Sequence, residues 1–104
     1  MIKLISTFGV KAGYDPEETY QLWIKEHVPY IKKLMPELRG YVIGRVVHNP
    51  GKEENFFGSV QLSYSTLDDA LRAVGRLLSN PPDEFMKRMA DVRRVIIKEE
   101  NMLP

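Results

Sequence analysis

The chain has 104 residues, 43% hydrophobic and 28% charged, which is enough apolar material for one globular domain with a single core. Its 15 Lys and Arg residues are balanced by 14 Asp and Glu residues, so the charge gives no reason to expect binding to nucleic acid or to an anionic membrane. The absence of cysteine excludes disulfides, thiolate zinc sites, iron–sulfur clusters and a cysteine nucleophile.

The sequence also lacks the marks of a secreted or membrane protein. Residues 1–8 combine one lysine with a short apolar alternation, unlike the charged region and long apolar run of a signal peptide. No stretch approaches the roughly 20 apolar residues that a membrane span needs. We therefore expect a soluble cytoplasmic protein with a single domain over residues 1–100 and a short tail at 101–104.

The first half of the chain predicts a strand followed by an interrupted helix. Residues 2–8 alternate between two faces with a period of two, which is typical of a strand. At Asp15 a capping carboxylate precedes a proline and two acidic residues, which is the pattern of a helix start. Pro29 removes one backbone donor within the apolar periodicity of this helix. We therefore expect a kink or a restart just after His27.

The second half predicts a long hairpin, two helical segments and a last strand. Residues 41–48 and 56–64 are rich in β-branched and aromatic side chains and read as strands. The turn Asn49-Pro50-Gly51 and a polar stretch over 52–55 separate these strands. Thr66 caps a second helix that stops at Asn80-Pro81-Pro82, and a short helical piece with Phe85, Met86 and Met89 leads to a strand over 92–99.

This element order predicts a fold and an assembly. The order βαββαβ is the ferredoxin-like arrangement, an α+β fold with an antiparallel four-stranded sheet and both helices on one face. Neither face of the predicted strands is polar throughout, since Ile5 opposes Leu4 and Val95 opposes Ile96. An uncovered apolar sheet face is an association site. We therefore predict a homodimer in which the two sheet faces pack together, although a loop or the tail covering the face would serve the same purpose.

One run of the sequence resembles a known family. The pattern Tyr20-x-x-Trp23-x-x-x-His27-x-Pro29, followed by Leu34-x-Pro36-x-Leu38-x-Gly40-Tyr41-Val42, is similar to the helix and following strand of the EthD family, in the dimeric α/β-barrel superfamily. The resemblance covers about the first half of the chain, and the second half agrees in element order only. It implies a two-sheet dimer with one pocket per subunit between helices and sheet. Superfamily relatives include cofactor-free polyketide cyclases and monooxygenases, lactone isomerases and some haem-degrading enzymes, whereas EthD-like proteins often lack a defined reaction.

His27 is the residue best suited to catalysis. An unperturbed imidazole titrates near pH ~6.5 and can both accept and donate a proton. Trp23 would lie one turn before it, and Tyr20 and Tyr30 could help to stack a flat aromatic substrate. The alternative is that His27 only bonds a backbone carbonyl beside the kink and that Trp23 is ordinary core. The resemblance implies a pocket histidine at position 27.

Other side chains are weaker candidates. Tyr41 and Arg45 share one strand face, where they could polarise a carbonyl or hold a carboxylate, although Arg45 could equally protect an edge strand. Serine hydroxyls and Gln61 could orient a ligand, and His48 reads as an exposed loop residue. Met35, Met86 and Met89 read as adaptable core filler. With His27 as the catalytic residue, the predicted substrate-binding residues are Phe8, Tyr20, Trp23, Tyr30, Tyr41, Arg45, Gln61 and Phe85.

These residues predict an enzyme that acts on an aromatic or polyketide-like carbonyl compound by proton transfer and needs no cofactor or metal. Isomerisation, cyclisation with loss of water and oxygenation all remain open. A second hypothesis is a non-catalytic dimeric ligand-binding or accessory protein, and a third is a haem-binding protein with an imidazole ligand. The two histidines have no metal-ligand spacing, and the glycine pattern of a phosphate or dinucleotide loop is missing.

Overall fold

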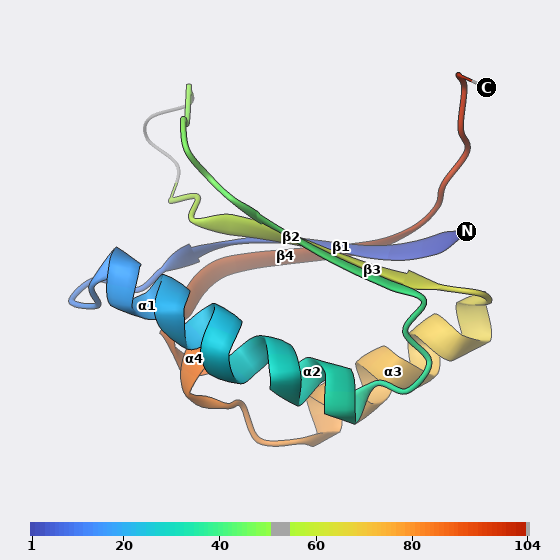
Figure 1. Cartoon of the computed structure of the whole chain (residues 1–104), viewed down its shortest axis with the longest axis horizontal. Coiled ribbons are helices and arrows are strands. Elements are labelled where there is room, and N and C mark those ends of the chain that lie inside the picture. The colour runs from blue at the N-terminus through green and yellow to red at the C-terminus, as the bar shows by residue number, and fades with distance from the viewer. Residues whose placement is uncertain (51–54, 104) are drawn as a thin grey trace.

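Four antiparallel strands form one sheet in the order β2-β3-β1-β4 (Figure 1). The computed structural model describes residues 1–50 and 55–103. The strands are β1 (Ile2–Val10), β2 (Gly40–Arg45), β3 (Gly58–Tyr64) and β4 (Met89–Lys98). The central pair β1 and β3 is flanked by the edge strands β4 and β2, as the ferredoxin-like prediction requires.

The helices all cover one face of this sheet (Figure 1). They are α1 (Pro16–Leu22), the π-helical turn η1 (Trp23–His27), α2 (Val28–Leu34), α3 (Leu67–Ser79) and the short α4 (Glu84–Arg88). Both predicted caps are present, because the side chain of Asp15 accepts from the Glu18 N–H and that of Thr66 accepts from the Asp69 N–H. The predicted α+β architecture is confirmed.

Several predicted strand boundaries were wrong, and the largest differences are in β2 and β4. β2 ends at Arg45 instead of reaching His48, because the chain beyond it turns away from the sheet (Figure 1). β4 begins at Met89, which we had placed in a helical piece. The β1–β4 register shifts between Thr7 and Gly9, and Asp91 adopts a positive φ of 52°. Such a bulge cannot be seen in the hydrophobic pattern.

Gly51 and most of the polar stretch predicted over 52–55 lie outside the described residues, as does Pro104 of the predicted tail.

The core between helices and sheet consists of two clusters. One is centred on Leu4, Ile31 and Leu62. The other is aromatic and contains Phe8, Trp23, Phe57 and Phe85. Both clusters lie on the face of the sheet that the helices cover, so any internal pocket must open between these two layers.

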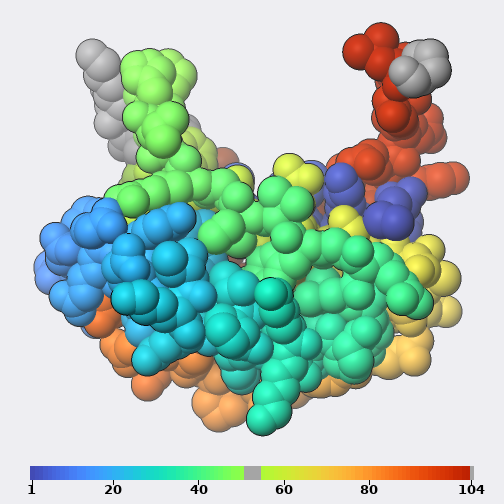
Figure 2. Space-filling view, viewed as in Figure 1, coloured from blue at the N-terminus to red at the C-terminus, as the bar shows by residue number. Residues whose placement is uncertain are grey.

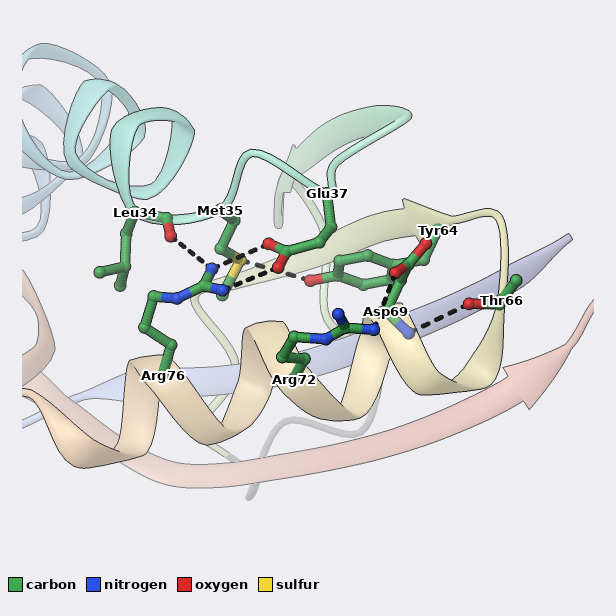
Figure 3. A network of polar contacts seen from close by, with 8 residues as sticks. All are labelled: Leu34, Met35, Glu37, Tyr64, Thr66, Asp69, Arg72 and Arg76. Atoms are coloured by element: carbon green, nitrogen blue, oxygen red, sulfur yellow. Dashed lines mark hydrogen bonds and ion pairs between the residues drawn. The ribbon is translucent and has the colours of Figure 1, made fainter.

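An ion-pair network ties α3 to the chain that leaves α2 (Figure 3). The Arg76 guanidinium donates to both carboxylate oxygens of Glu37, at 2.8 and 2.7 Å, and to the Leu34 carbonyl at 2.8 Å. Hydrogen bonding from Arg76 lowers the pKa of Glu37 to about 2. The Glu37 carboxylate therefore stays ionised well into the acidic range, and the network holds α3 against the end of α2 and the segment that follows it.

The opposite face of the sheet is uncovered. Its side chains include Ile5, Val42, Val95 and Ile97, of which Val42 and Val95 are 60% and 56% exposed. Two segments, one after β2 and one at the C-terminal end, rise on this side and flank the sheet (Figure 2). Within residues 1–50 and 55–103, no helix is long and apolar enough to cross a membrane.

Candidate functional site

The position of His27 depends on the π-helical turn that precedes Pro29. The Val28 N–H donates to the Trp23 carbonyl five residues earlier, so the helix widens by one residue where the proline cannot continue the α-helical ladder. The helix is irregular beside His27, as predicted, but in place of a kink or a restart just after His27 it has a π turn that ends at His27 within a continuous helical run. His27 is the last residue of this turn and is buried.

The imidazole of His27 is paired with a carboxylate from the other end of the chain. His27 Nδ1 lies 2.6 Å from Asp83 Oδ2, and the second Asp83 oxygen accepts from the Met86 N–H at 2.9 Å. Asp83 is thus the N-cap of α4 and the partner of His27 at once. The Phe85 ring lies 4.7 Å from the imidazole between ring centroids, so an apolar wall adjoins the pair.

The charge of Asp83 determines which imidazole nitrogen of His27 can accept a proton from a substrate. Burial alone would raise the pKa of Asp83, but the hydrogen bonds from His27 and the Met86 N–H outweigh it and hold that pKa below its ordinary value. The ionised carboxylate makes Nδ1 the donor. In a neutral imidazole Nε2 then carries the lone pair, which is the arrangement of a general base.

His27 borders a cavity of about 40 Å³ between the helices and the sheet. Four polar side chains line it, Ser6, His27, Tyr41 and Arg94, and the rest of the lining is apolar. A cavity of this volume has room for only a few water molecules. The cavity is therefore a small, mostly apolar chamber with a histidine, a phenol, a hydroxyl and a guanidinium in its walls.

Tyr41 is fixed in its protonated form. Burial raises the pKa of its phenol, and the negative charge of Asp83 raises it further, followed by a contribution from Tyr64. A phenol with a raised pKa remains a hydrogen-bond donor at all physiological pH values. Tyr41 can therefore donate to an oxygen inside the cavity but cannot act as a base there.

Four of the predicted site residues meet at this cavity, namely Phe8, His27, Tyr41 and Phe85. Trp23 is fully buried, with its ring stacked on Phe85 at 5.3 Å, and it does not line the cavity. Tyr20 packs edge-on against Trp23, and Tyr30 lies 6.2 Å from His27 between ring centroids. These three aromatic residues surround the site without lining it.

Arg45 and Gln61, also predicted to bind substrate, do not line this cavity. Arg45 shares the covered face with Tyr41 but pairs with Glu17 at 2.6 Å, and its guanidinium lies 4.4 Å from the Tyr20 ring centroid. Gln61 faces the uncovered side, because its neighbours Val60 and Leu62 face the cavity. The pleat of β3 therefore separates Gln61 from His27.

Sequence reasoning missed Asp83 and Arg94. Asp83 follows two prolines and precedes Glu84, which signals a helix cap but not a partner 56 residues away. Arg94 looks like any charged residue of an edge strand. Met86 and Met89, which we interpreted as core filler, also line the cavity, whereas Met35 is fully buried in the core.

Metal ligands do not cluster in the part of the chain that the structure describes. No group of three or more His, Asp or Glu side chains there is arranged to hold a metal ion.

Comparison with known proteins identifies the fold. No family model and no curated protein sequence matches the chain. A solved EthD (ethyl tert-butyl ether D) family protein from Bacillus halodurans is similar, with 17% identity, a TM-score of 0.66, and 96% of this chain and 99% of that chain covered. A dimeric protein of unknown function with a ferredoxin-like fold, from Bacteroides fragilis, has 17% identity and a TM-score of 0.59 over 94% and 95% of the two chains.

A third similar structure is SnoaB, a cofactor-independent oxygenase from Streptomyces nogalater. It is 11% identical, with a TM-score of 0.61, and 99% of this chain and 96% of that chain are covered. At such low identities the likeness concerns the fold and not the chemistry. The chain has the ferredoxin-like fold, as its resemblance to the EthD family implied.

Proposed function

We propose that this protein is an enzyme that moves a proton on an aromatic or polyketide-like carbonyl compound without a cofactor. The observation that carries the proposal is the 2.6 Å contact between His27 Nδ1 and Asp83 Oδ2 at the wall of a chamber that Tyr41 also lines. An oriented histidine and a donor to oxygen are the two groups that proton abstraction next to a carbonyl requires.

The proposed step uses each group once. Nε2 of His27 accepts a proton from the carbon next to the carbonyl, and the electron pair of the broken C–H bond forms a C=C bond. The carbonyl oxygen becomes an enolate oxygen, which accepts a hydrogen bond from the Tyr41 hydroxyl. Asp83 stabilises the imidazolium that results. Return of the proton to a different carbon completes an isomerisation, and loss of water after ring closure completes a cyclisation.

The cavity must enlarge before an aromatic substrate can enter it. A cavity of roughly 150 Å³ is known to bind benzene, whereas this one measures about 40 Å³. Met86 and Met89 in its wall are flexible side chains that can rearrange without loss of backbone hydrogen bonds. We propose that these two methionines move aside when an aromatic ring enters.

The likeness to SnoaB supports the proposal at the level of the fold. That protein is described as a cofactor-independent oxygenase, so a chain of this architecture can catalyse a reaction without a bound cofactor. The groups assigned to the reaction are this chain's own and do not depend on that likeness.

Deuterium exchange tests the proposal without knowledge of the natural substrate. The wild-type protein is expected to speed the incorporation of solvent deuterium at the benzylic carbon of phenylpyruvate, followed by NMR. The His27→Gln variant should lose this activity by about 100-fold or more, since general base catalysis contributes that much. His48→Gln, which changes the exposed second histidine, is the matched control and should remain as active as the wild type.

Full activity of a folded His27→Gln variant would show that His27 is not the general base. If the wild-type protein binds aromatic carbonyl compounds tightly but exchanges no deuterium, the non-catalytic ligand-binding function is correct instead.

We further propose a homodimer built from the two uncovered sheet faces. Val42 on β2 and Val95 on β4 are more than half exposed and lie in one row of this face with Gln61 and Ile5, and the dimeric protein from Bacteroides fragilis shares the fold. Val95→Glu is expected to give a monomer in light scattering, because each subunit would have to bury an unpaired carboxylate in the interface. Leu78→Glu, at an exposed position on α3, is the control that should leave the dimer intact. A wild-type monomer at tens of micromolar would contradict the assembly.

A further inference from the structure

Arg94 combines two features that the proposed reaction has not used. It lies on β4 directly opposite Ser6 of β1, and both side chains line the cavity beside His27. At the same time Arg94 is exposed to solvent. A side chain that is exposed and also lines the cavity marks the place where the cavity meets the solvent.

The other arginines of the helix-covered side are engaged in the protein itself. Arg45 pairs with Glu17, Arg76 with Glu37, and Arg88 with Glu18 and Glu84. Arg94 has no hydrogen bond or ion pair with any residue in 1–50 or 55–103. Its guanidinium is therefore available to a ligand at the mouth of the chamber.

We infer that Arg94 binds a carboxylate of the substrate, so that the substrate class is a keto acid. This inference rests on the proposed proton transfer and adds the group that recognises the substrate. A guanidinium presents two parallel N–H donors that match the two oxygens of a carboxylate.

The charges in the site favour this orientation. Asp83 is ionised beside His27, so a carboxylate that entered deeply would be repelled by it. At the mouth the same carboxylate is attracted by Arg94 and screened by water. Proton abstraction turns a keto acid anion into a dianion, and the guanidinium offsets part of this added charge.

Calorimetry with two probes tests the inference. Phenylpyruvate carries the carboxylate, and its methyl ester has the same ring and carbonyl without the charge. Arg94→Gln is expected to weaken the binding of phenylpyruvate by about 10- to 100-fold and to leave binding of the ester unchanged. Arg93→Gln is the matched control, because the neighbouring arginine points to the opposite face of the same strand, and it should bind both probes like the wild type.

The outcomes separate this inference from the proposed function, since binding is measured without turnover. Equal losses in the two variants, equal affinity of the wild type for acid and ester, or no binding of either probe would overturn the role of Arg94. If His27→Gln abolishes deuterium exchange while Arg94→Gln binds phenylpyruvate normally, the proposed proton transfer is supported and the assignment of a keto acid substrate is wrong. Binding through Arg94 in a wild-type protein that exchanges no deuterium supports the carboxylate site and overturns the proton transfer.

Discussion

Replacing Asp83 with asparagine is expected to slow deuterium exchange by on the order of 100-fold while the fold and the melting temperature change little. Asparagine is as good an N-cap as aspartate, so its side-chain oxygen can still accept from the Met86 N–H and keep α4 in place. The remaining amide N–H₂ would face His27 Nδ1 and favour the tautomer with its proton on Nε2. That nitrogen then has no lone pair with which to accept the substrate proton.

The measurement is the exchange rate of phenylpyruvate as a function of its concentration, so that kcat and KM are separated. The loss should fall on kcat, because asparagine removes neither the cavity nor Arg94. Asp15→Asn is a matched control, since Asp15 caps α1 in the same way without contacting a histidine. If Asp83→Asn keeps its full kcat, the pair with His27 serves only to hold α4 against the first helix.

Local features of this fold could be predicted from the sequence. The caps at Asp15 and Thr66 and the interruption at Pro29 depend on residues within one or two turns of each other, and all three are present. The end of β2 is different, because Val46 and Val47 are good strand residues, yet Val47 is 96% exposed where the chain leaves the sheet. A propensity reports how well a residue fits a strand, not whether a neighbouring strand is there to pair with it.

The candidate site shows the same division. His27 and Tyr41 could be singled out because a titrating side chain and a strand face are visible in the sequence itself. Asp83 could not, since its pairing with His27 depends on how α4 docks against the turn η1. Arg94 required the register of β4 against β1, which places it opposite Ser6, and that register is offset by the bulge at Asp91. Contacts of this kind follow from the assembled sheet and have no local signal.

Trp23→Ala is expected to lower the free energy of unfolding by about 3 to 5 kcal/mol, which is the usual cost of removing a fully buried tryptophan. The Trp23 ring has no exposed surface, and its neighbours Phe8, Phe57 and Phe85 lie at ring-centroid distances of 5.2 to 5.9 Å. Total stabilities of single domains are about 5 to 15 kcal/mol, so the loss would bring this one near its limit. Urea unfolding followed by circular dichroism measures it, with extrapolation to water.

Trp23→Phe separates this packing role from the substrate stacking that the sequence predicted. Phenylalanine keeps an aromatic ring in the cluster, and it also removes the indole Nε1, which is buried without a hydrogen-bond partner among the described residues. We therefore expect a much smaller loss of stability than in Trp23→Ala and an unchanged KM for phenylpyruvate, because Trp23 does not line the cavity. A large rise in KM with little change in stability would show that Trp23 contacts the substrate. It would also mean that the cavity enlarges past Phe85 when substrate binds, because the Phe85 ring contacts both the Trp23 indole and the His27 imidazole.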